Sequence, residues 1–167
     1  MKQVYPWVLV ALCAIAHAQA PEPQYGIKQD SPPTGSNIKK NAVSPFRIPV
    51  NLPYGQLPPE ARKYLHGYYE DIKEGDEPPF PLEGLKAYLD PIQKAQQKLL
   101  VEGPMNLIAT VDRTGAVTQV KVVGTPIPKM TEFAGRALLL TRFKPAVCGG
   151  QPCQMDFPVY LRFNLAW

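Results

Sequence analysis

The stretch CQMDFPVYLRFNL, residues 153–165, decides the fold of this chain. Apolar and polar residues alternate through it, and side chains on a β-strand point alternately to the two faces of a sheet. One face carries Cys153, Met155, Phe157, Val159, Leu161, Phe163 and Leu165. The opposite face carries Gln154, Asp156, Pro158, Tyr160, Arg162 and Asn164. The pattern predicts a long strand with one dry face and one solvated face.

The segments before this strand predict a hairpin followed by a helix. Met105 to Asp112 and Ala116 to Val123 are rich in apolar and β-branched residues, and a tight turn at Arg113–Gly115 joins them. From Lys129 to Thr141 the apolar residues recur at helical spacing. Together these elements indicate an α+β fold, in which a small antiparallel three-stranded sheet with β-β-α-β order packs on helices.

Residues 46–91 predict an extended segment followed by amphipathic helices. Phe46 to Tyr54 alternates, but its prolines cannot donate to a ladder, so it is either an edge strand or an extended segment lying on the domain. A first helix is expected from Pro58-Pro59-Glu60 to Gly75. A second helical stretch begins at Leu82, and Asp90-Pro91 is either the start of a new helix or a sharp kink.

The N-terminal region predicts export. Residues 1–20 have a basic Lys2, an apolar run of about ten residues from Trp7 to Ala16, and small-residue cleavage sites up to Ala20, as in a cleavable signal peptide. A membrane-spanning helix needs roughly twenty apolar residues. We therefore expect a periplasmic protein, with an inner-membrane anchor as the alternative. Residues 21–45 then form a Pro-rich flexible linker.

Cleavage of the signal would leave two cysteines, Cys148 and Cys153. Paired cysteines in an exported protein typically form a disulfide, and these two flank a turn-forming stretch at residues 149–152. Opposed residues of a hairpin lie at a Cα separation that a disulfide tolerates. A redox-active pair is the alternative, but the spacing is not that of thiol oxidoreductases. We therefore expect a structural disulfide.

The charge and the polar residues indicate neither nucleic-acid binding nor catalysis. The formal net charge is +4, without a cluster of Lys and Arg. His66 is the sole histidine outside the expected signal, so no second histidine could join it at a metal. We therefore expect a binding protein rather than an enzyme, with no cofactor, metal, nucleic acid or small-molecule substrate.

The final strand is the best candidate for a binding site. Pro158 lacks a backbone N–H, which places the strand at a sheet edge with that position facing outward. An exposed edge is a template for a partner strand or for a homodimer. Alternatively, Pro158 blunts the edge against aggregation, or Phe46 to Tyr54 covers it. The expected docking residues are Val159, Tyr160, Leu161, Arg162, Phe163, Asn164 and Leu165, of which Tyr160, Arg162 and Asn164 would supply specificity.

An ordered set of short motifs within residues 92–167 resembles the C-terminal domain of TonB and its TolA-like relatives. The set comprises Asp112-x-x-Gly115-x-Val117, Ala137-Leu138, Arg142-Phe143-x-Pro145-Ala146, Gly150-x-Pro152 and Phe157-Pro158-x-x-x-x-Phe163-x-Leu165. The resemblance implies a small α+β domain at the periplasmic end of an energy-coupled outer-membrane transport system. It also implies that the sheet edge binds an extended segment of an outer-membrane TonB-dependent-type receptor by strand addition.

The N-terminal region departs from that family. TonB carries an uncleaved N-terminal helix that engages a proton-driven motor, whereas this chain has a short apolar run followed by cleavage sites. The expected function is a periplasmic TonB-like protein that takes part in transmembrane transport. The alternative is a soluble structural or interaction protein of the cell envelope, which uses the same fold without energy transduction and binds another envelope protein.

Overall fold

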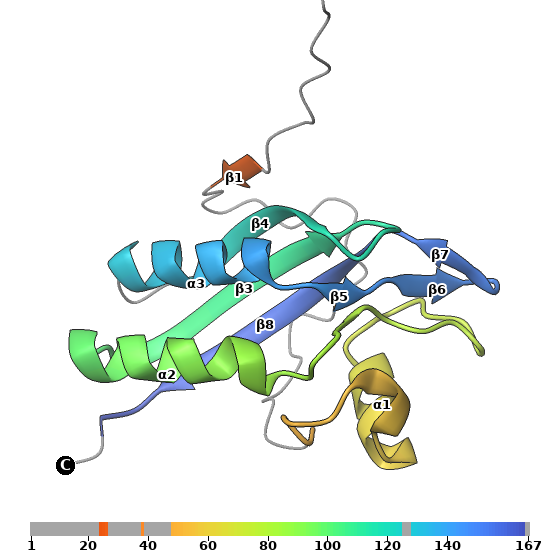
Figure 1. The fold of residues 1–167 in the computed structure, drawn as a ribbon, viewed down its shortest axis with the longest axis horizontal. Helices are drawn as coiled ribbons and strands as arrows, with labels where there is room; N and C mark the ends of the chain where they lie inside the picture. The colour runs from red at the N-terminus through yellow and green to blue at the C-terminus, as the bar shows by residue number, and fades with distance from the viewer. Residues whose placement is uncertain (1–23, 27–37, 39–47, 125–127, 166–167) are drawn as a thin grey trace, which may run out of the picture.

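The computed structural model describes residues 24–26, 38, 48–124 and 128–165 (Figure 1). The helices are α1 (Pro59–His66), α2 (Lys86–Leu99) and α3 (Pro128–Leu140), with a 3-10 turn, η2 (Tyr54–Gln56). The strands are β1 (Gln24–Gly26), β2 (Phe80–Pro81), β3 (Gly103–Val111), β4 (Val117–Gly124), β5 (Phe143–Lys144), β6 (Ala146–Cys148), β7 (Gln151–Cys153) and β8 (Met155–Phe163). The protein is therefore mixed α+β, as the sequence predicts.

The main sheet has the strand order β1-β4-β3-β8. β3 lies at its centre and pairs antiparallel with β4 on one side and with β8 on the other, which is the predicted antiparallel three-stranded unit. β1 adds a fourth strand, parallel to β4, within the stretch 21–45 whose composition predicts a linker. Apart from β1 and Ile38, that stretch lies outside the described residues, as does the expected signal at residues 1–20.

Helices α2 and α3 lie side by side over one face of the sheet (Figure 1). Their apolar stripes are buried, at Tyr88 and Ile92 in α2 and at Met130, Ala134 and Leu138 in α3. Beneath them, the central strand β3 is buried along most of its length. Removal of this apolar surface from water is the main stabilising contribution to the fold.

At the turn between β3 and β4, the motif that contains Gly115 contacts the motif that contains Phe143. The Asp112 carboxylate accepts hydrogen bonds from the backbone N–H groups of Thr114 (2.8 Å) and Ala116 (3.0 Å), which fixes the turn. Gly115 adopts φ +82°, and a Cβ at this position would overlap the Phe143 carbonyl. The Phe143 N–H donates to the Gly115 carbonyl (2.9 Å). The motifs that contain Gly115 and Phe143 therefore meet at one closely packed joint.

α1 is shorter than the predicted helix. It begins at Pro59 as expected but ends at His66, where the apolar spacing predicts continuation to Gly75. Tyr68 and Tyr69 leave the helical path and are buried, with 7% and 6% of their surfaces exposed. The aromatic spacing beyond His66 therefore reflects packing of two tyrosines against the rest of the domain, and the prediction of one long helix is wrong.

α2 runs through Pro91 as one helix, so Asp90 does not cap a new one. The Asp90 carboxylate instead lies 2.7 Å from Lys86 Nζ, one turn earlier. The residues from Leu82 onward do not start this helix, because Gly84 has φ +82°, which is incompatible with an α-helical backbone.

The predicted final strand divides at Gln154. Cys153 pairs with Ala146 in the β6–β7 hairpin, whereas Met155 pairs with Val111 of β3. The apolar alternation runs across this break although only β8 contains buried residues, since Cys153 is half-buried and Gln151 and Pro152 are exposed. A single pattern in the sequence therefore covers strands that belong to two different sheets.

Candidate functional site

Strand β8 forms one margin of the main sheet. It pairs with β3 in continuous antiparallel register from Met155 to Phe163. Over the described residues, no strand pairs with its other side. The backbone groups that point away from β3 therefore determine what this edge can bind.

Two hydrogen bonds identify the outward positions of β8. The Asp156 carbonyl accepts from the Tyr69 hydroxyl (2.9 Å) and so points away from β3. Its cross-strand partner Thr110 directs its carbonyl toward Thr118 of β4 (3.3 Å), away from β8. Because backbone direction alternates along an antiparallel strand, every second residue of β8 shares the direction of Asp156. The outward positions are Asp156, Pro158, Tyr160 and Arg162.

Both ends of this edge are occupied by side chains of the same chain. At one end the Tyr69 hydroxyl donates a hydrogen bond to the Asp156 carbonyl. Pro158, which follows, has no N–H that could donate to a partner. At the other end the side-chain amide of Gln96 donates to the Asn164 carbonyl (3.2 Å). A partner strand would therefore have to bind between these two points.

The stretch between the two ends keeps unpaired backbone groups. The Pro158 carbonyl and the N–H and carbonyl groups of Tyr160 and Arg162 face outward by the alternation described above. Within the described part of the chain, no hydrogen bond satisfies them. They form a short row of donors and acceptors at the spacing that an added strand requires.

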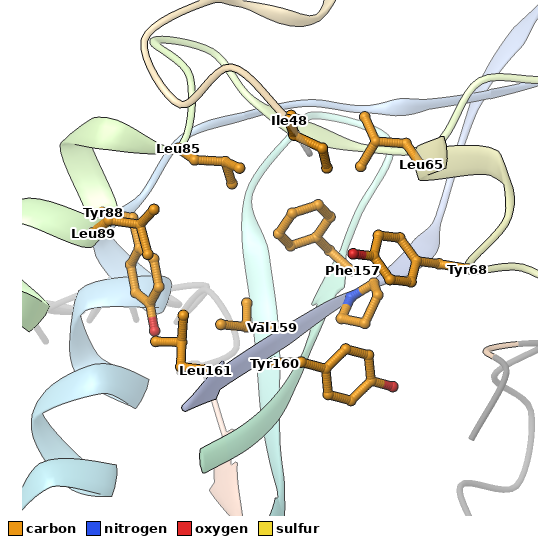
Figure 2. Close-up of a pocket in the computed structure, with 11 residues that line it drawn as sticks. Ile48, Leu65, Tyr68, Leu85, Tyr88, Leu89, Phe157, Val159, Tyr160 and Leu161 are labelled. Carbon is orange, nitrogen blue, oxygen red and sulfur yellow. The ribbon is translucent and has the colours of Figure 1, made fainter. Parts of the chain in front are cut away.

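A small apolar cavity of about 40 Å³ opens beside this row (Figure 2). Leu65 and Tyr68 border it from α1 and the turn after it, Leu85 and Tyr88 from the start of α2 and the residue before it, and Val159 from β8. Figure 2 shows that the Val159 side chain points toward the α2 side of the sheet. The cavity has room for one small group, since a single water needs about 10–15 Å³ by this measure.

Tyr88 borders this cavity, but its hydroxyl is enclosed and has less than 1 Å² of accessible surface. Among the described residues, its hydroxyl is the only buried side-chain oxygen or nitrogen without a hydrogen-bond partner. The residue is 3% exposed, and burial raises the pKa of its phenol, which therefore stays protonated and able to donate. In Figure 2 this hydroxyl lies toward Leu161 of β8.

The solvated face of β8 is partly covered, which the simple alternation does not predict. Asp156 is half-buried, accepts from Thr110 Oγ1 (2.7 Å) and pairs with Lys121 (3.5 Å). Pro158 is buried as well. This half of the face is therefore committed to internal contacts, because a buried carboxylate needs these partners.

The predicted docking residues fall into two sets. Val159, Leu161 and Phe163 alternate with the outward backbone positions, and Val159 and Phe163 are buried. Tyr160 is half-buried with its ring 6.3 Å from that of Tyr68. The remaining predicted residues are Arg162 and Asn164, which are exposed, and Leu165, which is half-buried beyond the end of β8.

The described part of the segment Phe46 to Tyr54 does not pair with the β8 edge. Residues 48–54 form bends and turns rather than a strand, and the Val50 carbonyl accepts from the Lys86 N–H at the start of α2 (2.7 Å). Ile48 reaches the cavity only with its side chain. Residues 48–54 are thus a connection of bends and turns with Ile48 and Tyr54 buried, rather than the edge strand or the extended segment that the sequence predicts.

A polar cluster next to α1 could not be predicted from the sequence, because its members are far apart in the chain. The Tyr54 hydroxyl lies 3.1 Å from His66 Nε2, and Lys144 pairs with Glu77 (3.0 Å). Burial raises the pKa of Tyr54 to about 12. Burial also lowers the pKa of His66, against the opposing charges of Glu77 and Asp76. The cluster anchors α1, whose Leu65 borders the cavity.

The predicted disulfide is confirmed. Cys148 and Cys153 are bonded with their Cα atoms 5.8 Å apart, but they are not opposed in the hairpin as expected, because Cys148 pairs with Gln151 beside the turn and Cys153 pairs with Ala146 at the open end. The Asp76 carboxylate accepts a hydrogen bond from the Gly149 N–H in the same hairpin (2.8 Å). The bond therefore secures a hairpin that lies next to the start of β8 in the sequence.

A larger open groove of about 720 Å³ lies between α2 and α3. The exposed apolar side chains Leu82, Phe133 and Leu140 belong to it, and Arg136 on its rim is paired with Glu132 (2.6 Å). Most of its lining comes from α2, α3 and the turn before α2, and its geometry alone identifies no particular ligand.

No family model and no curated protein matches this chain. Over the described residues, no set of acidic, histidine or cysteine side chains is arranged to hold a metal ion. None of the helices in this part of the chain has the length and apolar character needed to cross a bilayer.

Proposed function

We propose that this protein is a periplasmic TonB-like binding protein that holds an extended segment of an outer-membrane receptor by strand addition at β8, and that it takes part in energy-coupled transport. The supporting observation is the unpaired row of backbone groups between Pro158 and Arg162, bordered by an apolar cavity. Backbone hydrogen bonds would supply affinity, and the cavity would select side chains. The proposal includes no catalytic role and no cofactor.

The resemblance to the TonB C-terminal domain supports the transport role. The structure gives a physical role to some of the motif residues on which the resemblance rests. Gly115 and Phe143, from two separate motifs, lie in direct contact, and Pro158 lies at an outward position of an edge strand. These motif residues specify the sheet and its edge, which is the part of the fold that strand addition needs.

The alternative is an envelope interaction protein that uses this edge without energy transduction. The two roles differ in the N-terminus, because a transducer must stay anchored to a motor in the inner membrane. Sequencing the N-terminus of the mature protein decides between them. A start near Gln19 or Pro21 supports the soluble role, whereas an intact Met1 supports the anchored transducer.

Strand addition is tested by titrating isotope-labelled protein with peptides from the N-termini of outer-membrane receptors. We expect the amide signals of Val159 to Leu165 to shift on binding. Shifts confined to the helices, or no binding by any receptor peptide, would contradict the proposal. A homodimer through β8 would give the same shifts in the absence of peptide, with a dependence on protein concentration.

Two substitutions at one position separate the backbone contribution from the side-chain contribution. Tyr160→Pro removes an outward N–H, whereas Tyr160→Ala removes the same ring and keeps the N–H. We expect the proline variant to bind peptide about tenfold more weakly than the alanine variant, because the partner's carbonyl loses its donor. Equal affinities would show that the partner does not pair with this backbone.

A further inference from the structure

Helix α3 carries a second apolar stripe that the fold leaves exposed. Its first stripe is buried against the sheet. The second stripe consists of Phe133, Ala137 and Leu140, at positions i, i+4 and i+7, and it faces the open groove between α2 and α3. Phe133 is 40% exposed and Leu140 is 84% exposed. A helix that is apolar on more than one side normally packs against a further neighbour.

The opposite wall of the groove is built of small side chains. Ala87 and Pro91 lie about one turn apart on α2, and Leu82 flanks them from the turn before the helix. Small side chains allow a neighbouring element to approach closely. Of the seven large apolar side chains exposed in the described part of the chain, three lie along this groove, namely Leu82, Phe133 and Leu140. Single exposed apolar residues are ordinary, whereas a cluster rimmed by charge marks an interaction surface.

The open form of the groove favours a helix over a small molecule. Small-molecule sites bury most of the surface of their ligand, whereas an amphipathic helix needs only one face covered. Phe133 and Leu140 are seven positions apart, or about 10 Å along the axis of α3, which two turns of a partner helix would match. α2 and α3 lie side by side (Figure 1), so a third helix can pack between them.

The charged side chains that line the groove are mainly basic. They are Arg136, Arg142 and one acidic residue, Glu83. Arg136 is paired with Glu132 (2.6 Å). Arg142 is exposed, and its guanidinium has no hydrogen bond or ion pair within the part of the chain that the structure describes. The groove therefore offers one free cation beside an apolar surface.

The backbone that carries this cation is held in place. The Arg142 carbonyl accepts from the Leu82 N–H (3.0 Å), and the next N–H, that of Phe143, donates to the Gly115 carbonyl (2.9 Å). The guanidinium thus extends from a fixed position beside the groove. A carboxylate is the group that its fork of N–H donors matches best.

We propose that the groove between α2 and α3 is a second docking surface, and that its occupant is an amphipathic helix of a partner protein. The helix has an apolar stripe of about two turns and an aspartate or glutamate that pairs with Arg142. The apolar run within residues 1–20 of this chain does not fit, because residues 1–20 contain no acidic residue. The inference does not depend on strand addition, since no residue of β8 lines the groove.

The test begins with a selection from a displayed library of three-turn helices, randomised on one face, against the full mature protein. We expect the selected helices to combine an apolar stripe at i, i+3 or i+4, and i+7 with an acidic residue, and to shift the amide signals of α2 and α3. Failure to select a helix, absence of the acidic residue, or shifts confined to β8 would overturn the inference.

Leu140→Gln tests the apolar contact without disturbing the fold, because the Leu140 side chain is almost fully exposed. We expect its melting temperature to equal that of the wild type and its affinity for a selected helix to fall about thirtyfold, as for a central apolar anchor. An unchanged affinity would overturn the inference.

Arg142→Gln tests the charge pair. We expect a selected helix to bind about fivefold more weakly to this variant, and to show no further loss when its own acidic residue has been replaced by glutamine. The matched control is Arg113→Gln, which removes the same charge from the exposed turn between β3 and β4, outside the groove. Equal losses for the two variants would show that only net charge matters, and would contradict the assigned pair.

The remaining outcomes separate this inference from other occupants and from the proposed function. A dimer in sedimentation equilibrium that Leu140→Gln dissociates would identify a second copy as the occupant and overturn the inference. Receptor peptides that bind β8 equally in the wild type and in Leu140→Gln would show that strand addition stands without this groove. Failure of every receptor peptide at β8, with selected helices still bound at α2 and α3, would overturn the proposed function alone.

Discussion

The turn between β3 and β4 and the outer edge of β8 belong to the same sheet but are built in opposite ways. In the turn, the Asp112 carboxylate, the Gly115 backbone and the Phe143 backbone satisfy one another's hydrogen-bonding groups at close contact. Along the edge, backbone groups at Tyr160 and Arg162 have no partner among the described residues.

This contrast indicates that the turn serves stability and that the edge serves binding. Groups that satisfy one another fix the fold, and they leave nothing with which to bind another molecule. Unsatisfied groups held in place by a rigid scaffold cost stability, and a partner can recover that cost by supplying hydrogen bonds. Substitutions in the turn should therefore change stability, and substitutions at the edge should change binding.

The largest effect is expected from Gly115→Ala in the turn. The added Cβ would overlap the Phe143 carbonyl at a φ of +82°, and relief of that overlap requires the turn or β5 to move. We expect a loss of more than about 3 kcal/mol in the free energy of unfolding, measured by urea denaturation.

Gly75→Ala is the matched control for this substitution. Gly75 has nearly the same backbone conformation, φ +86°, but no atom lies within 4 Å of its added Cβ. We expect a loss of only about 1 kcal/mol, from the left-handed backbone alone. Equal losses at the two glycines would show that the contact with Phe143 does not stabilise the turn.

An intermediate effect is expected from reduction of the Cys148–Cys153 disulfide. Closure of so short a loop stabilises by about 2 kcal/mol in the chain-entropy model. Urea denaturation with and without reductant measures this difference, and intact mass after alkylation confirms the state of the thiols. Peptide affinity at β8 should stay unchanged, because the bond lies in the separate β6–β7 sheet. Loss of binding on reduction would show that the disulfide also supports the binding edge, and would contradict the separation of the two regions.

The smallest effect is expected from the titration of His66. Burial holds its folded-state pKa below the ordinary value, which is about 6.5 in the unfolded chain. As the pH falls through 6.5, the unfolded state takes up the proton first, so stability falls with pH in this range. Protonation makes both ring nitrogens donors, so the Tyr54 hydroxyl could then only accept from His66 Nε2.

Comparison with His66→Gln isolates this effect, because the glutamine amide can donate or accept a hydrogen bond but does not titrate. We expect the variant to lose less stability than the wild type between pH 7 and pH 5, measured by thermal denaturation at several pH values. Identical slopes for the two proteins would show that His66 does not couple α1 to the domain in a pH-dependent way.

The sequence predicts the elements whose patterns are local and leaves out those that depend on distant pairing. The β3–β4 hairpin, α3 and the disulfide each follow from a periodicity or spacing within a few residues. β1 has three residues and carries no pattern. The end of α1 at His66 depends on two tyrosines packing elsewhere, and the division of the last strand depends on which neighbours Cys153 and Met155 pair with.

The candidate site shows the same limit. Pro158 alone predicts an edge strand, and topology places β8 at one. The cavity and the hydrogen bond from Tyr69 combine residues that are distant in sequence, so no motif could reveal them. The apolar spacing of α2 marks Tyr88 only as a core residue.

The central claim, that the outer side of β8 is open, is tested most directly by amide hydrogen exchange in the free protein. The account predicts slow exchange at Val159 and Leu161, which face β3, and fast exchange at Tyr160 and Arg162, which face outward. Slow exchange at all four amides would show that this edge is already paired, and would contradict the claim.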